Sequence, residues 1–210
     1  MAISTIRHMA KTVSENCTPE TKACLTPREI FIQAGIELMN KGGPDSLSLN
    51  GILTQANKPR GSFYAIFEDK DAYLSVLVRR YFQPATDILQ LFAESVLTEG
   101  RDTIEAWASW NAHRVLLAIN RGDRVVSLTE MAGRCSQPSL TAEACEAIFH
   151  QRTVALSAIL SAVFLLTEPE ARMRASLMLA MLDGVESRAS ATRSPDLVDQ
   201  FYLYFFKHIN

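Results

Sequence analysis

The chain has 210 residues, of which 48% are hydrophobic and 21% are charged, and its formal net charge is −2. This length allows a sizeable core and suits one small domain plus one medium one. The charge excludes a broadly basic surface, because residues 1–70 carry eight Lys and Arg against seven Asp and Glu, and residues 71–210 carry thirteen against sixteen. Any affinity for DNA must therefore depend on where individual cations sit.

The N-terminal residues 1–25 mix polar and charged side chains without periodicity, and we expect them to form a mobile arm. They contain no apolar segment of the kind found in a secretory signal. The longest apolar-rich run, Val154 to Leu166, includes two serines and is too short to span a bilayer. We therefore expect a cytoplasmic protein with no membrane partner.

Two helices are predicted before residue 57. Thr26 and Pro27 provide an N-cap followed by proline at the first helical position, and Gly42-Gly43-Pro44 ends that helix. Ser48 is the expected N-cap of the next helix. The first helix carries an apolar stripe formed by Ile30, Phe31, Ala34 and Leu38.

Residues 50–72, NGILTQANKPRGSFYAIFEDKDA, predict a short helix, a tight turn, a second short helix and the start of a third. Pro59 disfavours the helical region for Lys58, so the turn falls between the first two helices. Small and cationic groups then open the second helix, as in a helix–turn–helix that enters a DNA major groove. An ordinary helical hairpin is the alternative.

The sequence RGSFYAIF from Arg60 to Phe67, followed by KDAYL from Lys70 to Leu74, resembles the signature of the tetracycline-repressor (TetR) family of transcriptional regulators. That family shows a basic residue, glycine, serine or threonine, an apolar residue, tyrosine, two variable positions, phenylalanine, and then a lysine–acid pair. The match extends over about residues 26 to 78. It departs at Asn57 and Lys58, where the family usually has glycine and an aliphatic residue. Asn tolerates the left-handed conformation that such a turn needs, whereas the role of Lys58 is open.

Helix-period segments continue to the end of the chain, and no period-2 alternation flanked by hairpin signals occurs, so the predicted fold is all-α. We expect a three-helix helix–turn–helix DNA-binding domain over 26–72 and a helical effector-binding and dimerisation domain over 73–210. Further helices are predicted near residues 70–82, 84–98, 102–121, 124–135, 140–166, 168–192 and 195–209.

The last two predicted helices are apolar on more than one side. Residues 168–192 carry two apolar stripes on different faces of the predicted helix, and residues 195–209 are apolar on nearly every side. A helix of this kind is buried on two faces, which favours a partner subunit over the alternative of an unusually apolar monomer core. TetR-family proteins dimerise through a four-helix bundle of C-terminal helices, so the resemblance implies a homodimer through residues 168–209. The two stripes are Met173, Leu177, Ala180, Met181 and Gly184, and Met178, Leu182 and Val185.

Two such units on a two-fold axis would read two half-sites of a palindromic double-stranded operator. Arg60 and Lys58 are the candidates for a base edge or a phosphate, since the arginine fork matches guanine. Gly61 and Ser62 have small side chains, so the backbone at the start of the second helix can approach DNA closely. Ser48, at a helix N-terminus, can offer a hydroxyl and a backbone N–H to phosphate.

The resemblance adds two phosphate contacts, the Tyr64 hydroxyl and Lys70. Phe63 and Phe67, in the same stretch, are expected in the core. The resemblance also implies the function, a ligand-responsive DNA-binding regulator. Its usual form is a repressor that a small molecule releases from the operator.

The central helices, over 84–166, usually enclose a small-molecule pocket in this family. Trp107, Trp110 and Arg114 share one helical face here, at i, i+3 and i+7, which suits an aromatic or anionic effector. Met131 is expected behind them. The alternative is a pair of core aromatics with a snorkelling arginine.

The four cysteines lie at positions 17, 24, 135 and 145 and lack the spacing of a zinc site, so no metal and no cofactor are expected. Arg134 beside Cys135 is the one hint of the cationic setting that a reactive thiol needs. A thiol- or electrophile-sensing regulator of the same fold, using Cys135 or Cys145, is therefore the alternative function. The chain has no Walker loop, nucleophile elbow, zincin motif or Rossmann fingerprint, so we do not expect an enzyme.

Overall fold

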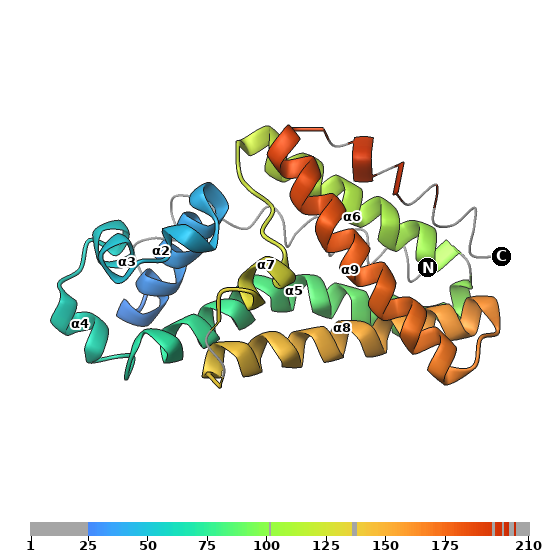
Figure 1. Cartoon of the computed structure of the whole chain (residues 1–210), viewed down its shortest axis with the longest axis horizontal. Coiled ribbons are helices and arrows are strands. Elements are labelled where there is room, and N and C mark those ends of the chain that lie inside the picture. The colour runs from blue at the N-terminus through green and yellow to red at the C-terminus, as the bar shows by residue number, and fades with distance from the viewer. Residues whose placement is uncertain are drawn as a thin grey trace.

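The computed structural model describes residues 25–100, 102–135 and 138–194, and then 196–198, 200–201 and 204. All regular structure in these residues is helical, which confirms the all-α prediction (Figure 1). The arm predicted over 1–25 and much of the helix predicted over 195–209 lie outside the described residues.

The helices form a head at one end of a long helix and a body at the other (Figure 1). Helices α2, α3 and α4 gather at the beginning of α5, α8 runs alongside α5, and α6 and α9 pack over the other end. In chain order the elements are α2 (Pro27–Gly42), the 3-10 turn η2 (Pro44–Ser46), α3 (Leu49–Ala56), α4 (Arg60–Tyr64), α5 (Lys70–Glu99), α6 (Asp102–Arg121), α7 (Leu128–Ala132), α8 (Leu140–Phe164) and α9 (Glu168–Thr192).

The caps that begin and end the head helices are those predicted. The Thr26 hydroxyl accepts the Glu29 N–H at 3.2 Å, and the Ser48 hydroxyl accepts the Gly51 N–H at 3.0 Å. Asn57 ends α3 in the left-handed conformation, at φ 50°, and so takes the place of the family's usual glycine. The helix–turn–helix geometry of α3 and α4 is therefore confirmed.

An aromatic cluster forms the core of the head. Phe63 lies edge-on to Phe31 at 5.4 Å between ring centroids, and Phe67 and Tyr73 complete the cluster. The Tyr73 hydroxyl donates to the buried Phe31 carbonyl at 2.9 Å. Gly35 makes this approach possible, because a Cβ there would lie 2.1 Å from the tyrosine oxygen. Phe63 and Phe67 are buried, as predicted.

Helix α5 runs unbroken through Pro84, so the two separate helices predicted over 70–82 and 84–98 were wrong. Proline removes one helical hydrogen bond, but its fixed φ is compatible with a helix. Burial on both sides of the proline outweighs the lost bond: Phe82 and Thr86 flank it in the interior, and the Thr86 hydroxyl donates to the Phe82 carbonyl at 3.0 Å.

Helix α7 is shorter than the predicted segment 124–135. The amides before it are bound elsewhere, because Arg124 N–H donates to the Asn40 carbonyl at 2.5 Å and Val125 N–H donates to the Ser190 hydroxyl at 2.9 Å. These bonds hold residues 124 and 125 between α2 and α9, in a segment that is not helical. The helix therefore starts only after Ser127, whose hydroxyl caps it.

One side of α9 carries buried polar groups that hold the neighbouring elements. Asp183 accepts both the N–H and the hydroxyl of Thr129, at 3.2 and 2.8 Å, and lies 3.6 Å from Arg152 of α8. Glu186 forms an ion pair with Arg114 of α6. Helix α9 is thereby tied to α6, α7 and α8 by charge-assisted bonds as well as by apolar packing.

The opposite side of α9 exposes the first of its two predicted apolar stripes. Met173, Leu177 and Met181 are 58%, 58% and 48% exposed, whereas Met178 and Leu182 are fully buried. Helix α8 is long and apolar enough by composition to cross a membrane, but it packs between α5 and α9 and only 28% of its most apolar window is buried in this chain. Both helices therefore present apolar surface that this chain does not cover.

Removal of the Asp183 carboxylate should destabilise the fold strongly. Asp183→Ala leaves Arg152 buried without its counter-charge, and we expect a loss of about 3–5 kcal/mol. Glu168→Ala on the same helix removes an exposed pair with Arg172 and should cost about 0–1 kcal/mol. Urea unfolding at one fixed protein concentration measures the free energy of unfolding of both variants. Equal losses would show that the Asp183–Arg152 pair stabilises the fold no more than the exposed pair does.

Candidate functional site

The start of α4 presents a cationic, uncrowded surface. Lys58, Arg60 and Gly61 are exposed and Ser62 is half-buried, while Phe63 on the opposite side anchors the helix in the aromatic core. A short helix that contacts DNA needs these two sides, since one side must pack against the core and the other must approach the ligand.

Arg60 and Tyr64 lie together on this surface, one turn apart. The Arg60 guanidinium lies 5.6 Å from the centre of the Tyr64 ring, and its Nη2 lies 3.4 Å from the tyrosine oxygen. Arg60 must therefore leave the ring to reach another acceptor, a cost of about 0.5–1 kcal/mol for an exposed cation–π contact.

Gly61 meets no steric restriction from the protein itself. A Cβ at this position would find no atom within 4 Å. Gly61 is in the first turn of a helix, where alanine has the higher helix propensity. The packing of the fold therefore does not require a glycine at this position.

Ser48 and Lys70, the two other candidates near this surface, both lie at helix N-termini. Ser48 is exposed and its oxygen caps α3, so its proton remains available to a partner. Lys70 is exposed at the first position of α5. No DNA is present, so all the predicted contacts stay predictions.

Asp71, next to Lys70, is a residue whose role the sequence did not reveal. Its carboxylate accepts the N–H of Leu140 at 2.7 Å and the N–H of Thr141 at 3.2 Å, and so caps the N-terminus of α8. Burial alone raises the pKa of Asp71, but these bonds and one from the Thr141 hydroxyl lower it overall. The partner is some 70 positions away, and no local pattern could have identified it.

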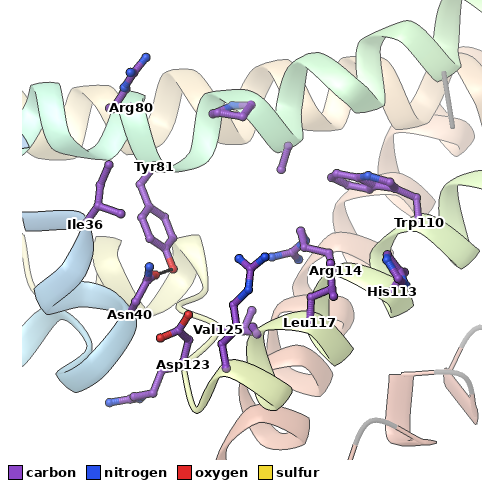
Figure 2. Close-up of a pocket in the computed structure, with 15 residues that line it drawn as sticks. Ile36, Asn40, Arg80, Tyr81, Trp110, His113, Arg114, Leu117, Asp123 and Val125 are labelled. Carbon is purple, nitrogen blue, oxygen red and sulfur yellow. Dashed lines mark hydrogen bonds between the residues drawn. The ribbon is translucent and has the colours of Figure 1, made fainter. Parts of the chain in front are cut away.

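A hollow of about 330 Å³ opens where the head meets the body (Figure 2). Ile36 and Asn40 of α2 line it on one side, and Trp110, His113, Arg114 and Leu117 of α6 line it on the other. Helix α5 contributes Arg80, Tyr81, Pro84 and Ala85, and the hollow is completed by Ala118, Arg121, Asp123, Arg124 and Val125.

The wall of this hollow is rich in cations. Arg80, Arg114, Arg121 and Arg124 line it, and Asp123 is the acidic side chain among its described lining residues. Arg114 lies 6.0 Å from the Trp110 ring and is paired with Glu186, which fixes its position. The arrangement combines an aromatic face, apolar groups and guanidinium groups.

The structure brings together only some of the residues that were predicted to bind an effector. Trp110 and Arg114 line the hollow, but Trp107 is 2% exposed in the body core, and Met131 lies in the head core beside a different hollow. Sequence spacing put Trp107 on one helical face with Trp110, but it could not give the depth at which each side chain lies. Nothing in the sequence indicated that α2 and residues 123–125 contribute to the wall of this hollow.

Tyr81 and Asn40 form the head side of the hollow. The Tyr81 hydroxyl donates to the Asn40 side-chain oxygen at 3.0 Å (Figure 2). Burial raises the pKa of Tyr81, partly offset by the charge of Arg114. The phenol is therefore neutral at physiological pH and acts as a hydrogen-bond donor.

Cys135 and Cys145 are free thiols, the first half-buried and the second buried. Burial raises the pKa of Cys135, and it raises that of Cys145 to about 12. Arg134, expected to make the setting cationic, forms an ion pair with Asp45. Both thiols are therefore mostly protonated at neutral pH.

No group of three His, Cys, Asp or Glu side chains in the described part of the chain could hold a metal ion. Glu146 and His150 line only an open hollow on α8, together with Ala142, Glu143 and Ala147.

The architecture is similar to solved structures of transcriptional regulators. The regulatory protein TetR from Rhodobacter sphaeroides aligns with a TM-score of 0.65 and 18% identity, over 87% of this chain and 98% of that chain. The reduced form of E. coli NemR aligns with a TM-score of 0.64 and 18% identity, over 85% and 94%. A transcriptional regulator from Rhodococcus sp. Rha1 aligns at 0.58 and 20% identity, over 84% and 92%.

The chain has the TetR-family fold. No family model and no curated protein matches the sequence. The likeness therefore lies in the arrangement of helices, which the RGSFYAIF signature had predicted from a single short stretch. In this TetR-family fold, α4 is the second helix of the helix–turn–helix, and α8 and α9 are the last long helices described.

Replacement of Asp71 by asparagine should loosen the joint between α5 and α8. Asp71→Asn substitutes an NH₂ for one of the accepting oxygens, and we expect a loss of about 1–2 kcal/mol at pH 7, as for a helix cap. Because the folded pKa is lowered, the carboxylate stabilises the fold above the unfolded value near 4, and the effect disappears as the pH falls through the folded pKa.

Unfolding in urea from pH 3 to 7 measures this difference. Glu94→Gln, which removes an exposed carboxylate from the same helix, is the control. A deficit in Asp71→Asn that stayed constant down to pH 3 would contradict the capping role of the charge.

Proposed function

We propose that the protein is a DNA-binding transcriptional regulator that acts as a homodimer and responds to a small anionic effector. The observation that carries the proposal is the start of α4, where exposed cations surround a glycine that the fold itself does not need. A helix that begins with cations and small side chains is well suited to contact DNA phosphates and base edges. We place the protein in the cytoplasm, where the DNA is.

The second copy of the chain would cover the exposed side of α9. Met173, Leu177 and Met181 form a continuous apolar row, and next to it a Cβ at Gly184 would meet no atom within 4 Å. The apolar window of α8, with Val154 43% exposed, extends this surface. Two apolar helices from each copy would make a four-helix bundle, as in other TetR-family regulators.

The hollow between head and body is the proposed effector site. Its position matters more than its size, because α2 belongs to the head while α6 and the 123–125 segment belong to the body. A ligand that pushes α2 away from α6 would tilt α4. Half-sites lie about 34 Å apart along the duplex, so a shift of a few ångströms in each head would misalign both grooves.

The chemistry of the wall favours an effector with a carboxylate, sulfonate or phosphate on an aromatic or apolar body. The described lining includes four arginines and one aspartate, and Trp110 offers an aromatic surface. Arg80, Arg114 and Arg124 also pair with Glu29, Glu186 and Glu130, so an anionic ligand would compete with these pairs. Because such a ligand competes with the DNA-competent spacing, we propose that it releases the operator, so that the protein acts as a repressor.

Three variants of the DNA surface should fail in different ways. Lys70→Ala removes a phosphate contact, so it should weaken binding to all duplexes equally and lower the salt slope by about 0.9. Arg60→Ala removes a base contact and should cost about 1–3 kcal/mol on the operator alone. Gly61→Ala should leave the fold as stable as before but weaken DNA binding, because the added methyl meets only the DNA.

Salt titrations on the duplex upstream of its own gene, and on a scrambled duplex, separate these outcomes. If Arg60→Ala lost affinity equally for both duplexes, Arg60 would contact a phosphate. Lys58 would then be the candidate for the base contact. Unchanged DNA binding by all three variants would refute the proposed surface.

A charge on the exposed row of α9 should separate the dimer. Leu177→Glu would bury two carboxylates in an interface that we expect to exceed about 1,000 Å², so the variant should sediment as a monomer at micromolar concentration. Leu97→Glu is the matched control, since Leu97 is 87% exposed on α5 away from this row. A wild-type protein that sediments as a folded monomer would refute the dimer.

A negative charge in the hollow should weaken the binding of an anionic aromatic probe. The probe is 1-anilinonaphthalene-8-sulfonate, an aromatic sulfonate whose fluorescence rises in apolar sites. Leu117→Glu places a like charge in the wall and should weaken its binding by about tenfold or more. Leu116→Glu, on the neighbouring residue outside the wall, should leave it unchanged. Equal effects of the two variants would place the probe elsewhere.

A further inference from the structure

Arg124 holds the C-terminal end of α2. Its backbone N–H donates to the Asn40 carbonyl at 2.5 Å, and its guanidinium donates to the Gly42 carbonyl at 3.3 Å and to the Glu130 carboxylate at 3.1 Å. Gly42 is the last residue of α2, where a bond from an arginine is favourable because it satisfies a free carbonyl at the negative end of the helix dipole. One residue therefore ties α2 to α7 and to the segment that follows α6.

The turn after α2 leaves room for this guanidinium. Gly43 has φ 71°, a conformation that favours glycine, and a Cβ there would lie 2.6 Å from Arg124 Nη1 and 3.0 Å from its Cζ. The guanidinium thus packs directly on the backbone of the turn. The position of Arg124 and the course of the chain at the end of α2 therefore depend on each other.

Arg124 also lines the hollow between α2 and α6, and it is easier to redirect than Arg114. The side chains of Arg124 and its partner Glu130 are 44% and 20% exposed, so their ion pair opens at little cost. Arg114 pairs with Glu186, whose side chain is only 4% exposed. An anion that drew Arg114 away would leave this buried carboxylate without its counter-charge.

Arg80, another arginine of the same wall, does not hold the end of α2. It pairs with Glu29 in the first turn of α2 and so joins this helix to α5. Both helices contribute residues to the head core. A redirected Arg80 would therefore leave the bonds between α2 and the segment after α6 in place.

We propose that Arg124 transmits the binding of an anionic ligand in the hollow to the head. The guanidinium exchanges its bonds to Gly42 and Glu130 for bonds to the carboxylate, sulfonate or phosphate of the ligand, whose geometry matches the arginine fork. The end of α2 then loses its tie to this side chain. This role of Arg124 rests on the proposed function, because the ligand is the one that occupies the proposed effector site.

Two fluorescent probes that differ in one charged group test this exchange. 1-Anilinonaphthalene-8-sulfonate carries the anion, and N-phenyl-1-naphthylamine has the same aromatic body without the sulfonate. Binding in the hollow is identified by its loss in Leu117→Glu. The ratio of the two dissociation constants is compared between variants, because any change in the width of the hollow affects both probes and cancels.

Arg124→Gln removes the guanidinium but keeps the backbone N–H, and Arg80→Gln is the control from the same wall. The loss of a charge-assisted bond in Arg124→Gln should change the ratio about tenfold against the sulfonate. Arg80→Gln should change it by about twofold or less, as for an exposed charge.

Glu130→Gln provides a second variant that keeps Arg124 and removes the carboxylate with which the ligand competes. It should change the ratio about threefold or more in favour of the sulfonate. That gain should disappear when Glu130→Gln is combined with Arg124→Gln. Glu29→Gln, the matched change at Arg80, should have the smaller effect.

Hydrogen exchange measured without DNA reports whether the end of α2 is released. The amides of Gly43, Ser46 and Leu47 are bonded in this turn. In the wild type the sulfonate should speed their exchange about threefold or more, because the turn opens more often. Arg124→Gln should show the fast exchange without any ligand, and the sulfonate should add little to it.

Three results would overturn the role of Arg124: equal changes of the ratio in Arg124→Gln and Arg80→Gln, a Glu130→Gln gain that persists without Arg124, or sulfonate binding that leaves exchange at residues 43–47 unchanged. If the sulfonate released the operator from Arg124→Gln as it does from the wild type, this role alone would be refuted and the proposed function would stand. A protein that binds no operator would refute the proposed function, while the probe ratios and the exchange rates would still decide what Arg124 does. Probe binding that does not depend on Leu117 would refute both.

Discussion

Helix α5 belongs to both cores, and the rest of the structure depends on its continuity. Its first turns place Tyr73 and Leu77 in the head, and its last turns place Leu89 and Phe92 in the body. A 30-residue helix spans about 45 Å at 1.5 Å per residue. The head therefore cannot change its angle to the body unless α5 bends or the contacts beside it rearrange.

The weakest point of that helix coincides with the hollow. Pro84 has no N–H, so the Arg80 carbonyl receives no amide from the next turn, and both residues line the hollow. A ligand there meets the part of α5 that has one hydrogen bond fewer, together with the α2 and α6 walls. In the proposed function, a ligand in the hollow would contact this part of α5 directly, so ligand binding and head movement would be coupled through α5 itself.

Polar contacts complete the link between α9 and the head. Asp183 and Ser190 of α9 hold the start of α7 and the non-helical segment before it, and Arg124 in that segment bonds to Asn40 of α2. Asp183, Ser190 and Val125 are buried, so a polar group left without a partner there would be costly. The helix that we propose as the dimer interface is therefore connected through the 124–125 segment to α2 of the head.

Local patterns in the sequence by themselves determined the helical fold, the caps at Thr26 and Ser48, the turn at Asn57 and the exposed start of α4, because these depend on neighbours within a few residues. The two apolar sides of α9 were also visible as periodicity. Only the tertiary structure decided that α5 passes through Pro84, that Asp71 caps α8, and that Trp107 is core while Trp110 lines the hollow. Each of these depends on burial or on a partner brought from another helix, and local spacing does not encode such distances.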